Sequence, residues 1–208
     1  MEKREKLYTL WGDDKINEEE MGLLRQKTKD IPAPFDAAGG KDIKTLVEAF
    51  LKRDDAFGLA APQIGISKRV TVFKNKNLYD REPVTSERDY DVLVNPRITQ
   101  FRGETEIMME GCLSCPDINV EVERYTEIKV KAYNIKGQKI SRRYTGFLAR
   151  VVQHECDHLD GKLIIDRGSR IQYPKEKEEF FNSIFQMGSQ NLEHLGGIYV
   201  QRYNVSIL

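Results

Sequence analysis

Two histidines four positions apart, with a glutamate directly after the first, constrain this chain more than any other feature. They are His154, Glu155 and His158. Residues four apart lie on one face of an α-helix, one turn or about 6 Å along its axis, so the pattern predicts a helix with both imidazoles on one side. Such a pair can bind one metal ion, and the glutamate between them can act as a base on a water molecule.

The neighbouring residues predict that this helix is buried. Phe147 and Val151 fall on the same stripe as the two histidines, and apolar residues continue to Leu159. Gly161 fits the position just after a helix end, so we expect a helix of about 14 residues near 145–160. Because the histidines continue an apolar stripe, a binding site explains them better than a solvated helix surface does.

A thiol about forty residues earlier is the natural third ligand. Cys112 follows Gly111, which permits tight backbone geometry, and Pro116 stiffens the turn after it. A thiolate binds a divalent ion strongly and neutralises part of its charge. One thiolate and two imidazoles leave one coordination position open for water, which is typical of a catalytic site.

Two other interpretations of these residues stay open. Cys112 and Cys115 with the two histidines have the ligand set of a closed Cys₂His₂ zinc site, which would make the protein a metal-stapled binding module. The pairs are, however, much further apart than in a zinc finger. Alternatively, a downstream Asp or Glu could replace Cys112 as third ligand, as in an endopeptidase of the His-Glu-x-x-His type.

For three further residues near the cluster, the sequence allows more than one role. Cys156 falls on the far side of the helix and fits a small core residue. Asp157 could orient a ligand or lie on the helix surface. Arg124 could form an ion pair with Glu110 that supports the cysteine loop.

Composition excludes several function classes. Lys+Arg and Asp+Glu both number 33, so no net charge attracts nucleic acid or an anionic membrane. No apolar run is long enough to span a bilayer, and the charged start at residues 1–6 lacks the apolar core of a secretory signal. Three cysteines without an export signal indicate a reducing compartment, so we expect a cytoplasmic protein without a structural disulfide.

Hydrophobic periodicity predicts an α+β fold. Apolar residues three and four apart predict a helix over 41–54, with Gly39-Gly40 breaking the chain before it. Alternating or β-branched segments predict strands over 69–73, 92–98, 103–109, 118–123, 127–134 and 138–144. A polar stretch over 74–91 predicts a long loop, and Asn134–Gly137 predicts a turn. We expect one domain over 1–208, with mixed or antiparallel sheets packed around the helix near 145–160.

The tail contributes one more helix and a terminal strand. Residues 174–187 predict a helix with an aromatic stripe, and 198–208 alternate loosely as in a strand. The stripe has two interpretations. It packs on the domain, or it docks to a partner such as the ribosome or a second subunit.

Three ordered motifs in this chain resemble the signatures of peptide deformylases. They are GLAAPQIG at 58–65, EGCLS at 110–114 and QHECDHL at 153–159. The resemblance covers about residues 43–167, whereas 1–42 and 170–208 diverge. Ala56 and Asp117 stand where the family frequently has glycine. Alanine costs little unless its position needs a positive φ, and Asp117 bears on substrate preference more than on catalysis.

The resemblance implies a complete catalytic site. Cys112, His154 and His158 would hold one divalent ion, natively ferrous iron, with zinc, nickel or cobalt as substitutes. Glu155 would take a proton from the attacking water and pass it to the leaving amine. The side-chain amide of Gln63 and the backbone N–H of Leu113 would stabilise the oxyanion.

The resemblance also implies a substrate and its binding residues. The substrate would be the N-formylmethionyl end of a nascent peptide, and the products would be formate and a free amino terminus. Gly58 would let the substrate backbone approach like an added strand, and Val151 would form the floor of a methionine pocket. Glu110 and Gly111 would lie beside the substrate in the cysteine motif.

Overall fold

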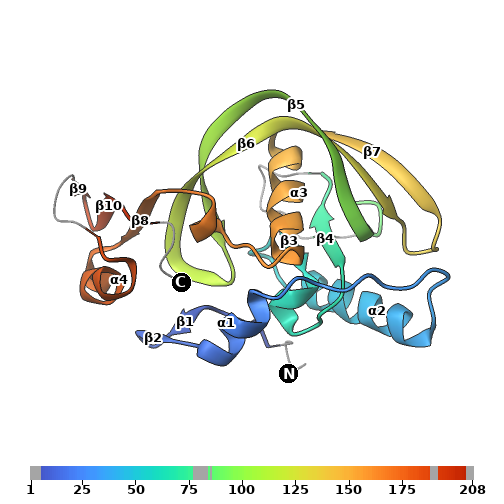
Figure 1. The fold of residues 1–208 in the computed structure, drawn as a ribbon, viewed down its shortest axis with the longest axis horizontal. Coiled ribbons are helices and arrows are strands. Elements are labelled where there is room, and N and C mark those ends of the chain that lie inside the picture. The colour runs from blue at the N-terminus through green and yellow to red at the C-terminus, as the bar shows by residue number, and fades with distance from the viewer. Residues whose placement is uncertain (1–5, 77–83, 85, 188–191, 205–208) are drawn as a thin grey trace.

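The computed structural model describes residues 6–76, 84, 86–187 and 192–204. A helix, α3 (Gly146–Leu159), lies at the centre, and two long strands, β5 (Tyr90–Cys112) and β6 (Cys115–Tyr133), arch over it (Figure 1). The other helices are α1 (Glu18–Leu24), α2 (Ala37–Leu51) and α4 (Glu178–Phe185). The fold is therefore α+β around a buried helix near 145–160, which confirms the prediction.

One antiparallel sheet of eight strands provides most of the framework. Its order is β3-β4-β5-β6-β8-β10-β9, and β7 also pairs with β6. The remaining members are β3 (Gly58–Ala60), β4 (Val70–Lys74), β7 (Lys139–Thr145), β8 (Arg170–Pro174), β9 (Glu193–Leu195) and β10 (Ile198–Arg202). A separate pair, β1 (Trp11–Gly12) and β2 (Lys15–Ile16), lies near the N-terminus and was not predicted. Short 3₁₀ turns occur at Ala61–Ile64, Ile164–Asp166 and Lys175–Lys177.

The β5–β6 hairpin merges strands that the sequence predicts as separate. Segments 92–98 and 103–109 are one strand, β5, and 118–123 and 127–134 fall within β6 or just beyond its end. The predicted gap between 98 and 103 corresponds to shifts of register between the two paired strands, not to a break. Gly103 adopts φ +73° at one of these shifts. The turn after β6 is as predicted, because Gly137 N–H donates to the carbonyl of Asn134 at 3.0 Å.

The predicted break at Gly39-Gly40 is wrong, because both glycines lie inside α2. Asp36 caps the helix, and its carboxylate accepts from the Gly39 N–H at 2.7 Å. A Cβ on Gly39 would come within 2.6 Å of Ile31 Cγ2, so this glycine allows close packing. The helix accordingly begins and ends a few residues earlier than the predicted 41–54.

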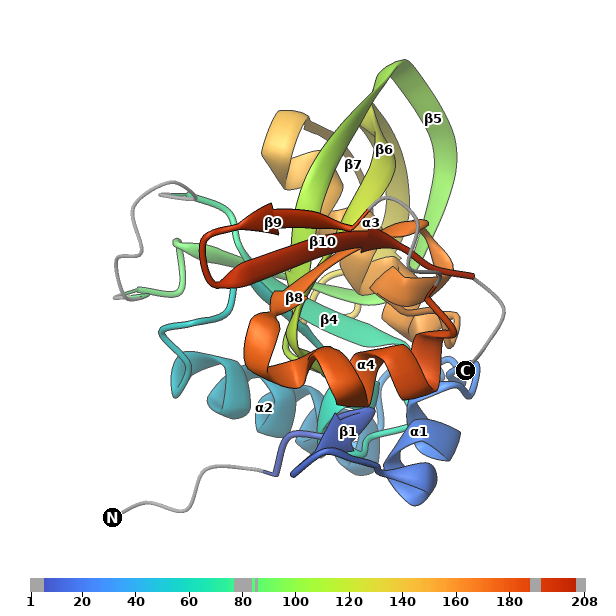
Figure 2. The same ribbon diagram turned by 90° about the vertical axis from the view of Figure 1, so that its left-hand side faces the viewer.

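The tail folds back onto the domain. The predicted helix at 174–187 is shorter, since Pro174 ends β8 and α4 covers Glu178–Phe185. Helix α4 lies beside β1 (Figure 2), and its residues Phe181 and Phe185 are fully buried in one cluster with Trp11 and Tyr173. The aromatic stripe therefore packs on the domain. Of the predicted terminal strand, Ile198–Arg202 forms β10, and 205–208 lie outside the described residues.

Of the predicted loop at 74–91, the described residues 75–76, 84 and 86–89 belong to neither a helix nor a strand, as predicted. Lys74 belongs to β4, and Tyr90 begins β5. Residues 77–83 and 85 lie outside the described residues. No helix in the described part of the chain is long and apolar enough to cross a membrane.

Gly161 and Gly40 should respond to alanine in opposite ways. Gly161 has φ +70°, and a Cβ there would meet the backbone oxygen of Arg25 at 2.2 Å, so Gly161→Ala should lower the free energy of unfolding by about 2 kcal/mol or more. A Cβ on Gly40 would meet no heavy atom of the described residues within 4 Å, so Gly40→Ala should stabilise α2 by up to about 1 kcal/mol. Urea unfolding measures both, and equal effects would contradict this packing.

Candidate metal centre and substrate pocket

Helix α3 and the end of β5 bring three metal-ligating side chains together. Cys112 Sγ lies 3.3 Å from His158 Nε2, which lies 3.2 Å from His154 Nε2. All three ligand atoms lie within 4.8 Å of one another. Donors on one tetrahedral ion at about 2.0–2.3 Å are themselves roughly 3.3–3.6 Å apart, so this set fits a single ion. Cys115 is not part of the group, so the described cluster is Cys-His-His rather than Cys₂His₂.

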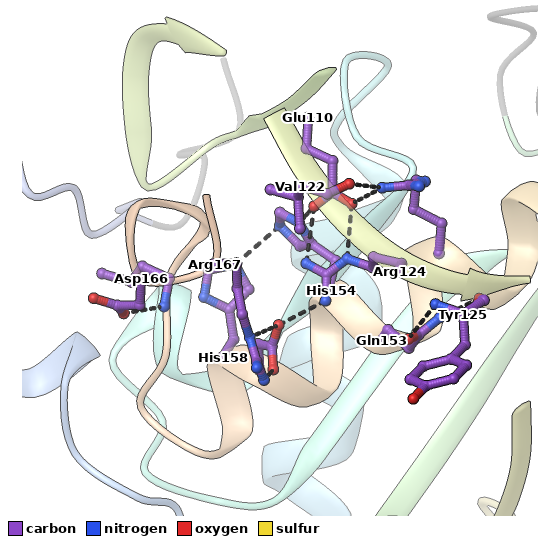
Figure 3. Close-up of polar contacts among 12 residues, drawn as sticks. Glu110, Val122, Arg124, Tyr125, Gln153, His154, His158, Asp166 and Arg167 are labelled. Atoms are coloured by element: carbon purple, nitrogen blue, oxygen red, sulfur yellow. Dashed lines mark hydrogen bonds and ion pairs between the residues drawn. The ribbon is translucent and has the colours of Figure 1, made fainter. Parts of the chain in front are cut away.

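Glu110 orients the first histidine. Its Oε2 lies 3.1 Å from His154 Nδ1, which is consistent with an Nδ1–H donor and leaves Nε2 for a metal ion (Figure 3). Carboxylates that hold the second nitrogen of a ligating histidine fix its tautomer and ring orientation. The cysteine motif therefore supplies the candidate ligand Cys112 and also Glu110, which positions the candidate ligand His154.

Two arginines neutralise Glu110 in the interior. Arg124 donates to both of its carboxylate oxygens, from Nε at 2.7 Å and from Nη2 at 2.9 Å, and Arg150 Nη1 donates at 2.6 Å. Burial by itself would raise the pKa of Glu110. The hydrogen bonds and charges of Arg124 and His154 outweigh burial and hold the pKa well below its ordinary value. The predicted Arg124–Glu110 ion pair is thus present.

Asp157 holds the other side of Arg124. Its Oδ2 accepts from Arg124 Nη1 at 2.7 Å, and its carboxylate also pairs with Arg167. Asp157 is buried. It is therefore not a solvated charge on the helix surface, and it fixes the arginine that holds Glu110.

Glu155 is a buried carboxylate with spare hydrogen-bonding capacity. It is 3% exposed, and its Oε2 has no hydrogen-bond partner among the described residues. Burial raises its pKa to about 7, although the charges of His154 and His158 act in the opposite direction. A pKa near neutrality suits a group that accepts and returns a proton.

Gly58 leaves the space that Glu155 occupies. A Cβ at position 58 would lie 2.4 Å from Glu155 Oε1 and 2.8 Å from its Cδ. The family resemblance implies that this glycine lets the substrate backbone approach closely. The structure adds a second reason for it, because any larger residue would displace the carboxylate.

Gln63 is held by its own motif and by the cysteine motif. Its Oε1 accepts from the Ala60 N–H at 2.9 Å, and its Nε2 donates to Ser114 Oγ at 3.2 Å. An amide NH₂ has two hydrogens, so one remains for another acceptor. Leu113 lies beside it, and both residues line the same pocket.

The pocket collects nearly all of the residues singled out from the sequence. Nine of the ten catalytic, substrate-binding and metal-binding residues implied by the resemblance line it, and the tenth, His158, is buried. The nine are Gly58, Gln63, Glu110, Gly111, Cys112, Leu113, Val151, His154 and Glu155. Apolar side chains complete the wall, and Phe57 and Phe147 meet edge to face at 5.3 Å.

Sequence reasoning missed several lining residues. Arg150, Phe57 and Met109 line the pocket without having been named. Arg150 stands one turn before His154, the same spacing that singled out the histidines, so helical periodicity could have placed it. Phe57, in the loop before β3, and Met109, in β5, carry no such signal.

The two departures from the family pattern fit the backbone differently. Ala56 is buried on the pocket wall, and it is not among the residues with positive φ. Alanine is therefore compatible with its position. Asp117 has φ +67°, which is the left-handed region that favours glycine.

Comparisons with known proteins agree with this geometry. A family model described as polypeptide deformylase matches residues 14–173, a wider span than the three motifs cover. The peptide deformylase of Thermotoga maritima is 43% identical over 145 residues, which are 70% of this chain and 80% of that protein. Peptide deformylase 1A of Arabidopsis thaliana, described as chloroplastic/mitochondrial, is 34% identical over 157 residues, which are 70% of this chain and 57% of that protein.

A solved structure shows the same fold. The class I type b peptide deformylase of Acinetobacter baumannii with Met-Ala-Ser bound is similar with a TM-score of 0.64 and 31% identity. The match covers 80% of this chain and 99% of that one. The sheet and central helix therefore belong to a fold already seen around a bound peptide.

Glu110→Gln should destabilise the fold in a pH-dependent way. Arg150 would lose the carboxylate that it pairs with, and Arg124 would keep only Asp157, so the free energy of unfolding should fall by about 3 kcal/mol at pH 7. The folded-state pKa of Glu110 is depressed, so its contribution is complete above the unfolded pKa of about 4.3 and is lost as pH falls towards the folded value. Urea unfolding from pH 7 to pH 3 should therefore show the parent and variant converging.

The matched control is Glu121→Gln. Glu121 pairs with Arg170 at 2.8 Å on a half-exposed surface, so its loss should cost at most about 1 kcal/mol. A parent-to-variant gap for Glu110 that stays constant down to pH 3 would contradict the assigned ion pairs.

Proposed function

Because the chain belongs to the peptide deformylase family, we propose that the pocket beside Cys112 is where its reaction takes place. The chain acts as a hydrolase that removes the N-formyl group from nascent polypeptides. The observation that carries the residue assignment is the convergence of a Cys-His-His cluster, a buried carboxylate and an apolar wall in one pocket.

Cys112, His154 and His158 would hold the ion. Their donor set, one thiolate and two imidazoles, suits a first-row divalent metal. Ferrous iron as the native metal, with zinc, nickel or cobalt as substitutes, follows from the family resemblance. A divalent ion there supplies Lewis acidity, which lowers the pKa of water and polarises a carbonyl.

Glu155 would carry the proton. It accepts a proton from the attacking water and returns it to the nitrogen of the leaving amine, while the bond between the formyl carbon and that nitrogen breaks. Support comes from its burial in the pocket, its unpartnered Oε2 and its pKa near neutrality. The products are formate and a free amino terminus.

Gln63 and Leu113 would stabilise the oxyanion that forms on the formyl oxygen. The free hydrogen of the Gln63 amide and the Leu113 backbone N–H are the donors. The Gln63 side chain is already fixed by Ala60 and Ser114, so it would not have to reorganise during the reaction.

The apolar wall would take the methionine side chain. Val151 and Phe147 come from α3, Met109 from β5, and Phe57 from the loop before β3. Met-Ala-Ser is bound to the related Acinetobacter baumannii enzyme, which supports a peptide that begins with methionine as the ligand here. Gly58 and Gly111 would line the path of the peptide backbone, and Glu110 would act through His154.

We further propose a cytoplasmic enzyme of one domain that meets its substrate at the ribosome. All three cysteines are free, which supports a reducing compartment. Trp11 shares one hydrophobic core with α4, which supports a single domain over 1–208. Since the apolar face of α4 is buried in that core, a ribosomal contact would use another surface.

Glu155→Gln should retain the metal and lose most of the activity. Removing the proton acceptor should lower turnover by about 10²–10⁴-fold while one ion per chain remains bound. Formate release from a formyl-Met-Ala-Ser peptide by nickel-loaded protein measures this. Cys115→Ser is the control, and it should keep both metal and activity because Cys115 is outside the cluster. Loss of metal in Cys115→Ser with full activity in Glu155→Gln would instead favour a structural zinc site.

Gly58→Ala should impair catalysis by displacing Glu155. The added methyl group cannot coexist with the carboxylate in its present position, and a displacement of about 1 Å at a reacting group can cost roughly 10²-fold in rate. The same formate assay, with metal content measured in parallel, checks this. Gly22→Ala is the control, because a Cβ there meets none of the described heavy atoms within 4 Å. Unchanged kcat in Gly58→Ala would show that Glu155 does not need this space.

A further inference from the structure

A segment of four residues near the N-terminus hydrogen-bonds to the motifs that contain Gln63 and Cys112. We call Tyr8–Trp11 the N-terminal brace. The Tyr8 N–H donates to the carbonyl of Gln63 at 2.7 Å, and the Leu10 N–H donates to the carbonyl of Ser114 at 2.9 Å. The brace therefore joins the glutamine motif and the cysteine motif, which are far apart in sequence.

Trp11 adds the contact nearest to the metal ligand. Its indole Nε1–H donates to the carbonyl of Pro116 at 3.0 Å. Pro116 lies in an irregular part of the β5–β6 ladder, where Gly111 faces Asn119 but Cys112 faces Cys115. Residues 116–118 are thus extra residues in β6 at the point where β5 presents its thiol.

A bulge of this kind redirects the side chains next to it. The irregular segment contains Asp117 in the left-handed region, which a non-glycine residue rarely adopts without support. The Trp11 hydrogen bond ties the segment to the core from outside the sheet. Cys112 pairs with Cys115 directly before this segment, so the conformation of the segment bears on the direction of the Cys112 side chain.

The indole itself is held firmly. Trp11 is 2% exposed, and its ring meets the rings of Phe180, Phe181 and Phe185 edge to face at 6.3, 5.5 and 5.9 Å. These three residues belong to α4, which lies beside β1 (Figure 2). The C-terminal helix therefore fixes the donor that holds the cysteine loop.

We propose that Trp11 is a positioning residue for the metal ligand Cys112, acting through the carbonyl of Pro116. This inference rests on the metal site of the proposed function. Trp11 is not among the residues that line the pocket, so its effect falls on how firmly the Cys112 thiolate is held in position. Loss of the Nε1–H should speed metal release and lower kcat, whereas KM should stay the same because Trp11 does not line the pocket.

The test uses cobalt-loaded full-length protein and the variant Trp11→Phe, which keeps an aromatic ring and removes the donor. Cobalt–thiolate absorption reports the Cys112–metal bond, and its decay in excess EDTA gives the release rate. Loss of one buried hydrogen bond should make release about threefold to tenfold faster. The matched control is Tyr173→Phe, which removes a 2.9 Å hydrogen bond to Gln201 from the same aromatic core and should leave the release rate unchanged.

A second variant separates the hydrogen bond from the packing. The chain has a single tryptophan, so 3-benzothienylalanine, which has sulfur in place of the indole N–H, can replace Trp11 alone with its two-ring shape intact. Faster cobalt release in this variant supports the proposal.

Parental release rates and cobalt spectra in both Trp11 variants would overturn the proposal, even if both melt at lower temperature. Equal acceleration in Tyr173→Phe would also overturn it, because the effect would then be general destabilisation. A parent protein without a cobalt–thiolate band would instead refute the metal site, and with it the proposed function.

Discussion

The buried carboxylate of Glu110 is the point on which the arrangement of the site depends. It stands on β5, accepts from Arg124 on β6 and Arg150 on α3, and orients His154 on the same helix. A lone charge in this interior would be strongly unfavourable, and two guanidinium groups make it tolerable. The same ion pairs that neutralise Glu110 also hold the hairpin against the helix. The ion pairs that neutralise Glu110 therefore also fix the orientation of His154.

Around this centre, the structure supports each chemical group from a different element. Glu155, the proposed base, occupies space that Gly58 leaves on β3, and Gln63 is fixed by Ser114 of the cysteine motif. The cysteine loop is held from below by the N-terminal brace and, through Trp11, by the C-terminal helix. The N-terminal brace and the C-terminal helix, which lie outside the three family motifs, thus pack against the glutamine and cysteine motifs.

Residue spacing and chemistry predicted His154, Glu155, His158 and Cys112, whereas Gln63, Leu113, Gly58 and Val151 followed only from the family resemblance. The i, i+4 histidines needed only a helix, and the cysteine motif was recognisable by its order relative to them. Arg150 was missed because a charged residue on a buried stripe gives no local sign of its partners. The Gly39-Gly40 break was wrong because Asp36 capping and packing on Ile31 outweigh the low helix propensity of glycine. The length of β5 and β6 depends on pairing between distant residues, which periodicity within one segment does not report.

The most direct test of the central claim is a metal titration of the metal-free protein, with two signals recorded from the same sample. Cobalt is added in steps under anaerobic conditions, and the cobalt–thiolate absorption and the rate of formate release from formyl-Met-Ala-Ser are both followed. If Cys112, His154 and His158 hold one catalytic ion, both signals rise together and saturate at one equivalent per chain. Formate release without added metal, or saturation of the thiolate band with no formate release, would contradict this account.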